Sequence, residues 1–424
     1  MIRGWRPPSW TPLARSASTV LAWNAARLVS QLAWVLLLAR SLGPHGYGTF
    51  SGLAGLALAL GGFAAFGMGL RLYQDVARDH RELPSHWPLV RSALAWSGPV
   101  LFVLYLLSSS AVQSGTAMVV VLSIGLAEVV LAPLCTQVAF AYASMGRMGE
   151  AAAVPVVLSL ARVAAALVYL LATPTSGLSA YTVMHVVATL AAVFWVWVSA
   201  HRRLGLPRRT RQIGIGELKS GFGFSSLWAS GLALTSLDKT AVMSAGGGAV
   251  AGEYTAGYRL ASIAALPVEA LTITIMPRLF RAGGGRPIAP RTIALLLGGV
   301  LVYGLVAGWL ACLMMPVLPV ILGDGFAGVM PVVALLGWWV PAYCLRMLTG
   351  NMMLGYGRKG LRVGLELSGL AAMTVLMLAW IPGAGLEGAF RALLVAEWMM
   401  ACLGVVLLAG ISRTSVNGFA PNGS

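Results

Sequence analysis

The sequence has few charged residues, and very few of them are acidic. Asp and Glu together number 13 of 424 residues, charged residues make up 10%, and hydrophobic residues make up 58%. A soluble globular domain of this length would not tolerate such a composition, so it indicates a polytopic membrane protein. Lys and Arg number 29. In a membrane chain this basic excess first indicates cytoplasmic loops, and we expect no nucleic-acid binding.

Cysteines are scarce, and a nucleotide-binding motif is absent. The 4 cysteines all lie inside apolar runs, where cysteine is an ordinary small core residue. We therefore expect neither a disulfide framework nor a metal site. No GxxxxGK[ST] segment occurs, which excludes ATP hydrolysis by a P-loop of this chain.

Long apolar runs dominate what is present. A run of about 20 residues crosses the hydrocarbon core of a bilayer, and the sequence predicts an all-α fold with twelve transmembrane helices in two lobes of six. The predicted spans are 17–39, 47–70, 92–111, 116–142, 151–172, 178–199, 221–244, 250–276, 292–322, 327–353, 364–381 and 387–410.

The charges of the loops predict which way the chain faces. The odd-numbered loops hold one cation, Arg40. Cytoplasmic loops of membrane proteins carry the Lys and Arg excess, so we expect both termini to be cytoplasmic. The even-numbered loops hold 18 cations: Arg71, Arg78, Arg81, Arg91, Arg147, Arg202, Arg203, Arg208, Arg209, Arg211, Lys219, Arg278, Arg281, Arg286, Arg291, Arg358, Lys359 and Arg362.

The longest polar stretch, residues 200–219, lies near the middle of the chain. It predicts an N-terminal six-helix lobe over 1–199, a cytoplasmic linker over 200–219, a C-terminal lobe over 220–410 and a cytoplasmic tail over 411–424. An ordinary loop that happens to be central is the alternative. Internal repeats are common in secondary transporters, whose substrate site lies between the halves near the midplane.

Three arginines, Arg27, Arg162 and Arg259, fall near the middle of predicted spans. A cation at the hydrocarbon centre costs about 2.5 to 3.5 kcal/mol on insertion scales, so such residues face a bundle interior, a water-filled cavity or a partner charge. Three at similar depth indicate a cationic cavity and an anionic cargo.

Polar neighbours accompany Arg27 on its helix. Asn24, Arg27 and Gln31 are spaced i, i+3 and i+7, which places them on one helical face. We interpret this face as a wall of a hydrophilic cavity. The alternative is a buried polar cluster in which Arg27 pairs with an acid such as Glu128.

Thr255, Arg259 and Ser262 repeat this spacing on the span 250–276, with Tyr254 and Tyr258 alongside. The same two interpretations apply. Arg162 has only Ser159 as a polar companion on its own face, so a partner has to come from another helix.

Other ionisable residues also lie inside the predicted spans. Asp238 and Glu128 are candidates for proton or sodium coupling, because an intramembrane carboxylate is a default relay candidate. The alternative for Asp238 is a structural counter-ion to one of the arginines. Lys239 follows Asp238 directly, and adjacent helical residues point about 100° apart, so the two need not satisfy each other. Arg346 is expected to snorkel toward the cytoplasm and Arg391 to anchor at the outer interface.

Several segments resemble a known transporter family. Residues 38–69 contain Arg40, Leu42, Gly43, Pro44, Tyr47 and Gly48 in an RxLGPxxYG arrangement, which is similar to the polysaccharide flippases of the multidrug/oligosaccharidyl-lipid/polysaccharide (MOP) exporter superfamily. The second half agrees over residues 237–279, with Asp238, Gly252, Tyr254, Arg259 and Pro277. GDGF at 323–326, LGYGRKG at 354–360 and GLEGAFRALLVAEW at 385–398 fit later segments.

The resemblance implies two six-helix lobes around a central cavity in a bacterial cytoplasmic membrane, and movement of an undecaprenyl-pyrophosphate-linked oligosaccharide for O-antigen or exopolysaccharide biosynthesis. A polymerase and a chain-length regulator would be its partners. By this resemblance Arg27, Arg162 and Arg259 would contact the anionic head group, while Asn24, Gln31, Tyr254 and Tyr258 would face sugar hydroxyls.

Competing functions come from other classes. A cation-coupled multidrug exporter of the same superfamily would share the helices, but its cavity should favour acids. A peptidoglycan-precursor flippase would be expected to have two further helices. The short odd-numbered loops disfavour a membrane glycan polymerase or ligase, so we expect a transporter without a cofactor, not an enzyme.

Overall fold

The computed structural model describes residues 10–112, 115–172, 177–269, 271–272 and 290–417. These residues form helices and contain no strand, which confirms the all-α prediction. The chain divides into two compact units, each described by itself below. Unit 1 comprises the described parts of Met1–Ser41, Leu60–Leu107 and Thr116–Ser226, and unit 2 those of Leu42–Ala59, Ser108–Gly115 and Leu227–Ser424.

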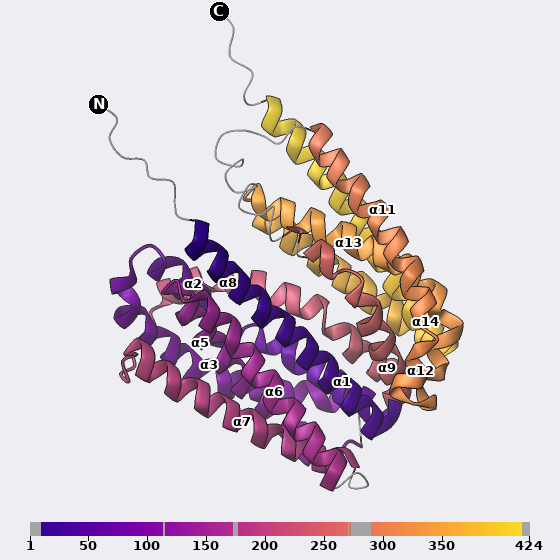
Figure 1. Ribbon diagram of the computed structural model, residues 1–424, viewed down its shortest axis with the longest axis horizontal. Coiled ribbons are helices and arrows are strands. Elements are labelled where there is room, and N and C mark those ends of the chain that lie inside the picture. The colour runs from indigo at the N-terminus through magenta and orange to yellow at the C-terminus, as the bar shows by residue number, and fades with distance from the viewer. Residues whose placement is uncertain (1–9, 113–114, 173–176, 270, 273–289, 418–424) are drawn as a thin grey trace, which may run out of the picture. The chain divides into compact units, whose positions relative to one another are not determined.

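Unit 1 is a bundle of helices (Figure 1), and its core is apolar. Trp87 and Val138 are fully buried at its centre, where the helices meet. Its elements are the first part of α1 (Trp10–Gly61), η1 (Ala64–Gly67), α2 (Met68–Val76), η2 (His80–Glu82), α3 (Leu83–Val112), α4 (Met118–Gly125), the π-helix η3 (Leu126–Leu131), α5 (Ala132–Ser144), α6 (Met148–Ala172), α7 (Gly177–Leu204) and the start of α8 (Ile215–Leu234).

Unit 2 is also helical, and large aromatic side chains fill its interior. Tyr254, Phe326, Trp339 and Phe390 are each at most 1% exposed. Besides the second part of α1 and the rest of α8, its elements include α9 (Leu237–Ile263), α11 (Pro290–Met314), α12 (Val317–Leu322), η4 (Asp324–Val332), α13 (Val333–Gly355) and α14 (Lys359–Asn417).

The helices cover the predicted spans, although several are joined or broken. Among the described residues eight helices are long and apolar enough to cross a membrane. Two of them, α1 and α14, bend at Gly43 (φ 66°) and Gly385 (φ 52°), so each contains two predicted spans. The span 221–244 is wrong as a single helix, because α8 ends at Leu234 and α9 begins at Leu237. Within α9 a bend at Gly247 precedes the span 250–276, of which residues 270 and 273–276 lie outside the described residues. The chain is thus a multi-pass membrane protein, while the number twelve stays a prediction.

The predicted span 47–70 is wrong as a single helix. The helix ends at Gly61, and Ala65, Phe66 and Gly67 all have positive φ. Such angles are rare for residues with a Cβ and persist only where the surroundings enforce them. The backbone N–H of Ala65 donates to the buried Ser97 hydroxyl at 2.9 Å, which holds this break in place.

The RxLGPxxYG segment has a structural explanation within unit 2. Gly43 supplies the left-handed backbone at the bend of α1, as glycine does at no steric cost. An added Cβ on Gly48 would overlap the backbone of Gly248 and Gly252 on α9. The motif therefore creates a turn and a close helix–helix contact.

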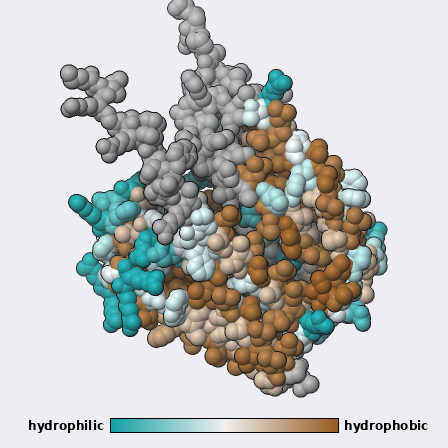
Figure 2. Space-filling model, viewed as in Figure 1, coloured by the Kyte–Doolittle hydropathy of each residue, from teal (hydrophilic) through white to brown (hydrophobic). Residues whose placement is uncertain are grey.

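Apolar side chains cover much of the visible surface, as expected for a face in lipid (Figure 2).

The segment after α7 is tied to α3: the Arg91 guanidinium donates to the Pro207 carbonyl at 3.3 Å, and the Ser92 hydroxyl accepts from the Arg211 N–H at 3.1 Å. The predicted linker is thus non-helical only between α7 and α8, and its role as linker stays a prediction. Pro277, Arg278, Arg281, Arg286 and the tail after 417 lie outside the described residues.

Candidate functional site

Three ionisable side chains from different helices meet inside unit 1. A carboxylate oxygen of Glu128 lies 2.7 Å from Nη2 of Arg162 and 3.0 Å from Nε2 of His185. Glu128 and His185 are buried, and the Arg162 side chain is 14% exposed. We call Glu128, Arg162 and His185 the unit 1 ion cluster. It supplies the cross-helix partner that the sequence required for Arg162.

Aromatic side chains extend this cluster to α1. The Trp34 indole N–H donates to the Tyr181 hydroxyl at 2.7 Å, and that hydroxyl lies 3.4 Å from Nδ1 of His185. The Arg162 guanidinium lies 5.9 Å from the centre of the Trp34 ring, within cation–π range. Since His185 Nε2 faces a carboxylate and Nδ1 faces a hydroxyl, a neutral ring with its proton on Nε2 satisfies both contacts.

The local backbone presents Glu128 to its partners. Glu128 belongs to the π-helix η3, a wider turn that interrupts the helical run from α4 to α5. Such π-bulges occur frequently at functional sites, because the extra residue shifts side chains around the helix axis. The other Glu128 oxygen, Oε2, is buried without a hydrogen-bond partner among the described residues. One oxygen thus carries both contacts.

A second set of charges lies inside unit 2. Lys239 Nζ is 2.8 Å from each carboxylate oxygen of Asp238, and the Tyr254 hydroxyl donates to Asp238 at 2.9 Å. The Lys239 ammonium also lies 3.8 Å from the centre of the Tyr258 ring. Adjacency left open whether Asp238 and Lys239 pair, and the structure shows that they do, because the long lysine side chain folds back onto its neighbour.

The expected snorkelling of Arg346 is also wrong. Arg346 is buried, its Nε lies 2.6 Å from Glu397 Oε2, and its guanidinium lies 4.9 Å from the centre of the Tyr343 ring. A buried carboxylate on α14 attracts the side chain inward more strongly than the interface does. Arg391, in contrast, is exposed and pairs with Glu387 on its own helix, so an anchoring role remains compatible with its position.

The polar face of α1 is not paired with Glu128. Asn24 and Arg27 are half-buried and Gln31 is exposed. The Arg27 Nε is buried and has no hydrogen-bond partner among the described residues. The alternative of an Arg27–Glu128 pair is therefore wrong, because Arg162 and His185 occupy that carboxylate.

The corresponding face of α9 is more closely packed. Thr255 is buried and shares a hydrogen bond of 3.1 Å with Ser51 of α1, while Arg259 and Ser262 are half-buried. The Tyr254 hydroxyl is already bound to Asp238, and Tyr258 packs on Trp339 with ring centres 5.0 Å apart. Direct glycan contact by these tyrosines stays a prediction.

Sequence reasoning overlooked His185, which is fully buried. The signal was present: an isolated titratable residue in the apolar span 178–199 is by default a functional-site candidate. It also left the Arg346–Glu397 pair unassigned, since only the packing of α13 against α14 shows which acid meets which base.

Comparison with known proteins identifies the family to which this chain belongs. A family model described as "Polysaccharide biosynthesis protein" matches residues 14–282. The chain belongs to this family. The match contains all of unit 1's ion cluster as well as Asp238 and Lys239. A search of curated proteins found no match.

Solved structures show the fold. An inward-facing multidrug resistance MATE transporter of the MOP superfamily is 13% identical, with 92% of this chain and 96% of that chain covered and a TM-score of 0.71. A MOP transporter from Pyrococcus furiosus Vc1, whose binding pocket of reverse polarity suggests a different function, is 12% identical, with 94% and 95% covered and a TM-score of 0.65. The predicted resemblance is confirmed at the level of the polysaccharide biosynthesis family, and these solved structures show that the chain shares their fold.

Proposed function

We propose that this protein is a flippase that moves a lipid-linked anionic oligosaccharide across the bacterial cytoplasmic membrane by alternating access. Its membership of the polysaccharide biosynthesis family carries the proposal. Arg27 supports it, because this cation lies about ten residues, or roughly 15 Å, from the start of the predicted span 17–39. Its Nε is buried and has no hydrogen-bond partner among the described residues. A pyrophosphate would supply the opposite charge.

The pairing of the buried acids supports an anionic cargo over a cationic drug. Among the described residues, the buried carboxylates are Glu128, Asp238, Glu366 and Glu397, and each is bound to a cation. A cationic compound would have to displace an arginine or lysine from one of them. An anion meets no such competition at Arg27, which favours the flippase over a multidrug exporter.

The decisive experiment is transport in proteoliposomes. We expect the purified chain to move a fluorescent polyprenyl-pyrophosphate oligosaccharide between leaflets, measured by loss of protection from a membrane-impermeant reagent. The same polyprenyl carrier without pyrophosphate should move at the protein-free rate. Uptake of a cationic dye, with no movement of the oligosaccharide, would establish the multidrug exporter instead.

We further propose that the unit 1 ion cluster carries a coupling proton. The groups that face Glu128 are Arg162, His185 and the buried Tyr105 hydroxyl. Protonation of Glu128 would remove the charge that holds Arg162 and His185, which gives the cluster two states. Sodium fits less well, because a guanidinium already lies 2.7 Å from the carboxylate. Sodium also fits poorly at Asp238 in unit 2, because Lys239 and Tyr254 already donate hydrogen bonds to that carboxylate.

Replacing Glu128 with glutamine should uncouple transport from the proton gradient. A fixed neutral side chain cannot bind and release a proton, so an imposed pH gradient should accelerate the wild-type protein and leave Glu128→Gln unchanged. Glu387→Gln is the matched control, because Glu387 is half exposed and pairs only with the exposed Arg391. Gradient-driven acceleration that survives in Glu128→Gln would assign the cluster a structural role.

A polymerase and a chain-length regulator of the same polysaccharide pathway are the proposed partners, since family membership places the chain in polysaccharide biosynthesis. Removal of the flippase in cells should then abolish the surface glycan while its lipid-linked precursor accumulates.

A further inference from the structure

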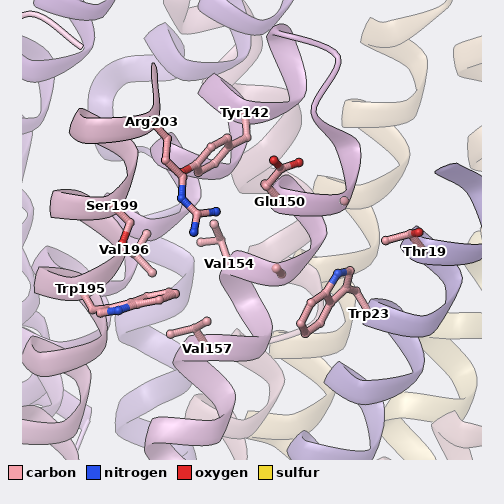
Figure 3. A pocket seen from close by; sticks show the side chains of 12 residues that line it. Thr19, Trp23, Tyr142, Glu150, Val154, Val157, Trp195, Val196, Ser199 and Arg203 are labelled. Atoms are coloured by element: carbon pink, nitrogen blue, oxygen red, sulfur yellow. The ribbon is translucent and has the colours of Figure 1, made fainter. Parts of the chain in front are cut away.

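A pocket unconnected with the proposed transport residues opens within unit 1 between α1, α6 and α7. Its cavity volume is about 330 Å³. Trp23 and Trp195 lie on opposite sides of it, and Val154 and Val157 form the floor (Figure 3). The two tryptophans are 37% and 55% exposed. We call this cavity the α1–α6–α7 pocket.

One cation at its rim, Arg203, lies beyond ion-pair distance of every described carboxylate, although it interacts with Glu150 at longer range. The Arg203 side chain points into the pocket above Val154 (Figure 3) and makes no ion pair among the described residues. Glu150 also lines the pocket, but its carboxylate is held by Arg147, whose Nε and Nη2 lie 2.9 and 2.6 Å away. Arg147 additionally donates to the Arg203 carbonyl at 3.3 Å. Arg147, Glu150 and Arg203 together therefore carry one net positive charge at this end of the pocket.

The position of the pocket matches a membrane interface. Arg203 lies in the last turn of α7 beside His201 and Arg202, where the apolar helix meets the polar segment. Tryptophan is enriched at this depth, because its ring is apolar at one end and can donate a hydrogen bond at the other. Tryptophans that only anchor separate helices at the interface need not lie close to each other, however. Here they flank one cavity with a charged rim and a valine floor.

We propose that the α1–α6–α7 pocket binds one anionic phospholipid. Its phosphate would lie on Arg203, and the first part of an acyl chain would lie between Trp23 and Trp195. At about 330 Å³ the cavity is at the lower end of the range for small-molecule pockets, which suits a head group and upper chain and not an oligosaccharide. This proposal is independent of the transported cargo.

Native mass spectrometry of the delipidated full chain tests it. We expect the first phosphatidylglycerol to bind about tenfold more tightly than phosphatidylcholine. Both lipids offer a phosphate to Arg203, but only phosphatidylcholine also carries a trimethylammonium group, which the cationic rim repels. Arg203→Gln should abolish this preference. Arg202→Gln is the matched control, since Arg202 is an exposed neighbour on the same turn that does not line the pocket, and it should keep the preference.

Two further measurements distinguish the pocket from general attraction. The double variant Trp23→Leu/Trp195→Leu should weaken both lipids, because the chain contact does not depend on the head group. A large excess of glycerol phosphate should not displace the lipid. If Arg202→Gln and Arg203→Gln lose the preference for phosphatidylglycerol equally, the preference arises from diffuse surface charge and the proposal is wrong. Equal binding of both lipids by the wild-type protein would also overturn it.

Discussion

Arg27→Gln is expected to lower oligosaccharide flipping in proteoliposomes by about tenfold or more. The substitution removes a cation whose Nε is buried and has no partner among the described residues. A hydrogen bond between charged groups contributes about 1.5 to 3 kcal/mol, and 1.4 kcal/mol corresponds to a factor of ten. Because Arg27 holds no described acid in place, we expect the thermal unfolding temperature to change little. The measurement is the initial flipping rate per folded transporter.

Two variants make this result specific. Arg27→Lys keeps the charge and should retain most of the rate. Arg40→Gln removes an exposed arginine from the same helix and should leave the rate unchanged. If Arg27→Gln flips the oligosaccharide as fast as the wild-type protein, Arg27 does not contact the pyrophosphate. An equally large decrease in the flipping rate of Arg40→Gln would show that the rate depends on the overall positive charge and not on Arg27.

Arg346→Met is expected to cause the largest loss of stability among the ion-pair variants. Arg346 and Glu397 are both buried and 2.6 Å apart. Removing one partner of such a pair leaves an uncompensated buried charge, which costs about 3 to 5 kcal/mol. We expect a correspondingly lower unfolding free energy in detergent, measured by denaturant-induced loss of helical circular dichroism.

The matched control is the exposed pair. Arg391→Met breaks a contact with Glu387 on the surface of the same helix that carries Glu397, and exposed pairs contribute about 0 to 1 kcal/mol. The double variant Arg346→Met/Glu397→Leu should recover much of the lost stability, since it removes both buried charges. Equal effects of Arg346→Met and Arg391→Met would show that burial of the pair is not what matters.

Much of the fold could be predicted from the sequence because the membrane restricts it strongly. An apolar run about 20 residues long has to form a helix, since the hydrocarbon core offers no water to its backbone groups. The predicted spans fall on described helices accordingly. The span 221–244 is interrupted at Thr235 and Ser236, and the span 47–70 is broken where Ala65 and Phe66 take positive φ. Nothing in their residue types announces this break, which depends on Ser97 from another helix.

The candidate site was less predictable, because its charges are paired between helices. Spacing showed that Arg162 lacked a partner on its own face, but the partner, Glu128, comes from a π-helix that no sequence pattern indicated. Adjacency could not decide whether Lys239 and Asp238 pair, and the flexible lysine side chain brings them together. Arg346 was placed at the interface, yet a buried acid holds it inside.

The sequence by itself determined that this chain is a multi-pass helical membrane protein of the polysaccharide biosynthesis family. Hydropathy and the order of motifs are properties of the sequence, and they are the same for any arrangement of the helices. Only the tertiary structure decided which buried charges neutralise one another, because a side chain selects its partner by distance across helices. That selection joins Glu128, Arg162 and His185 in one cluster that does not include Arg27.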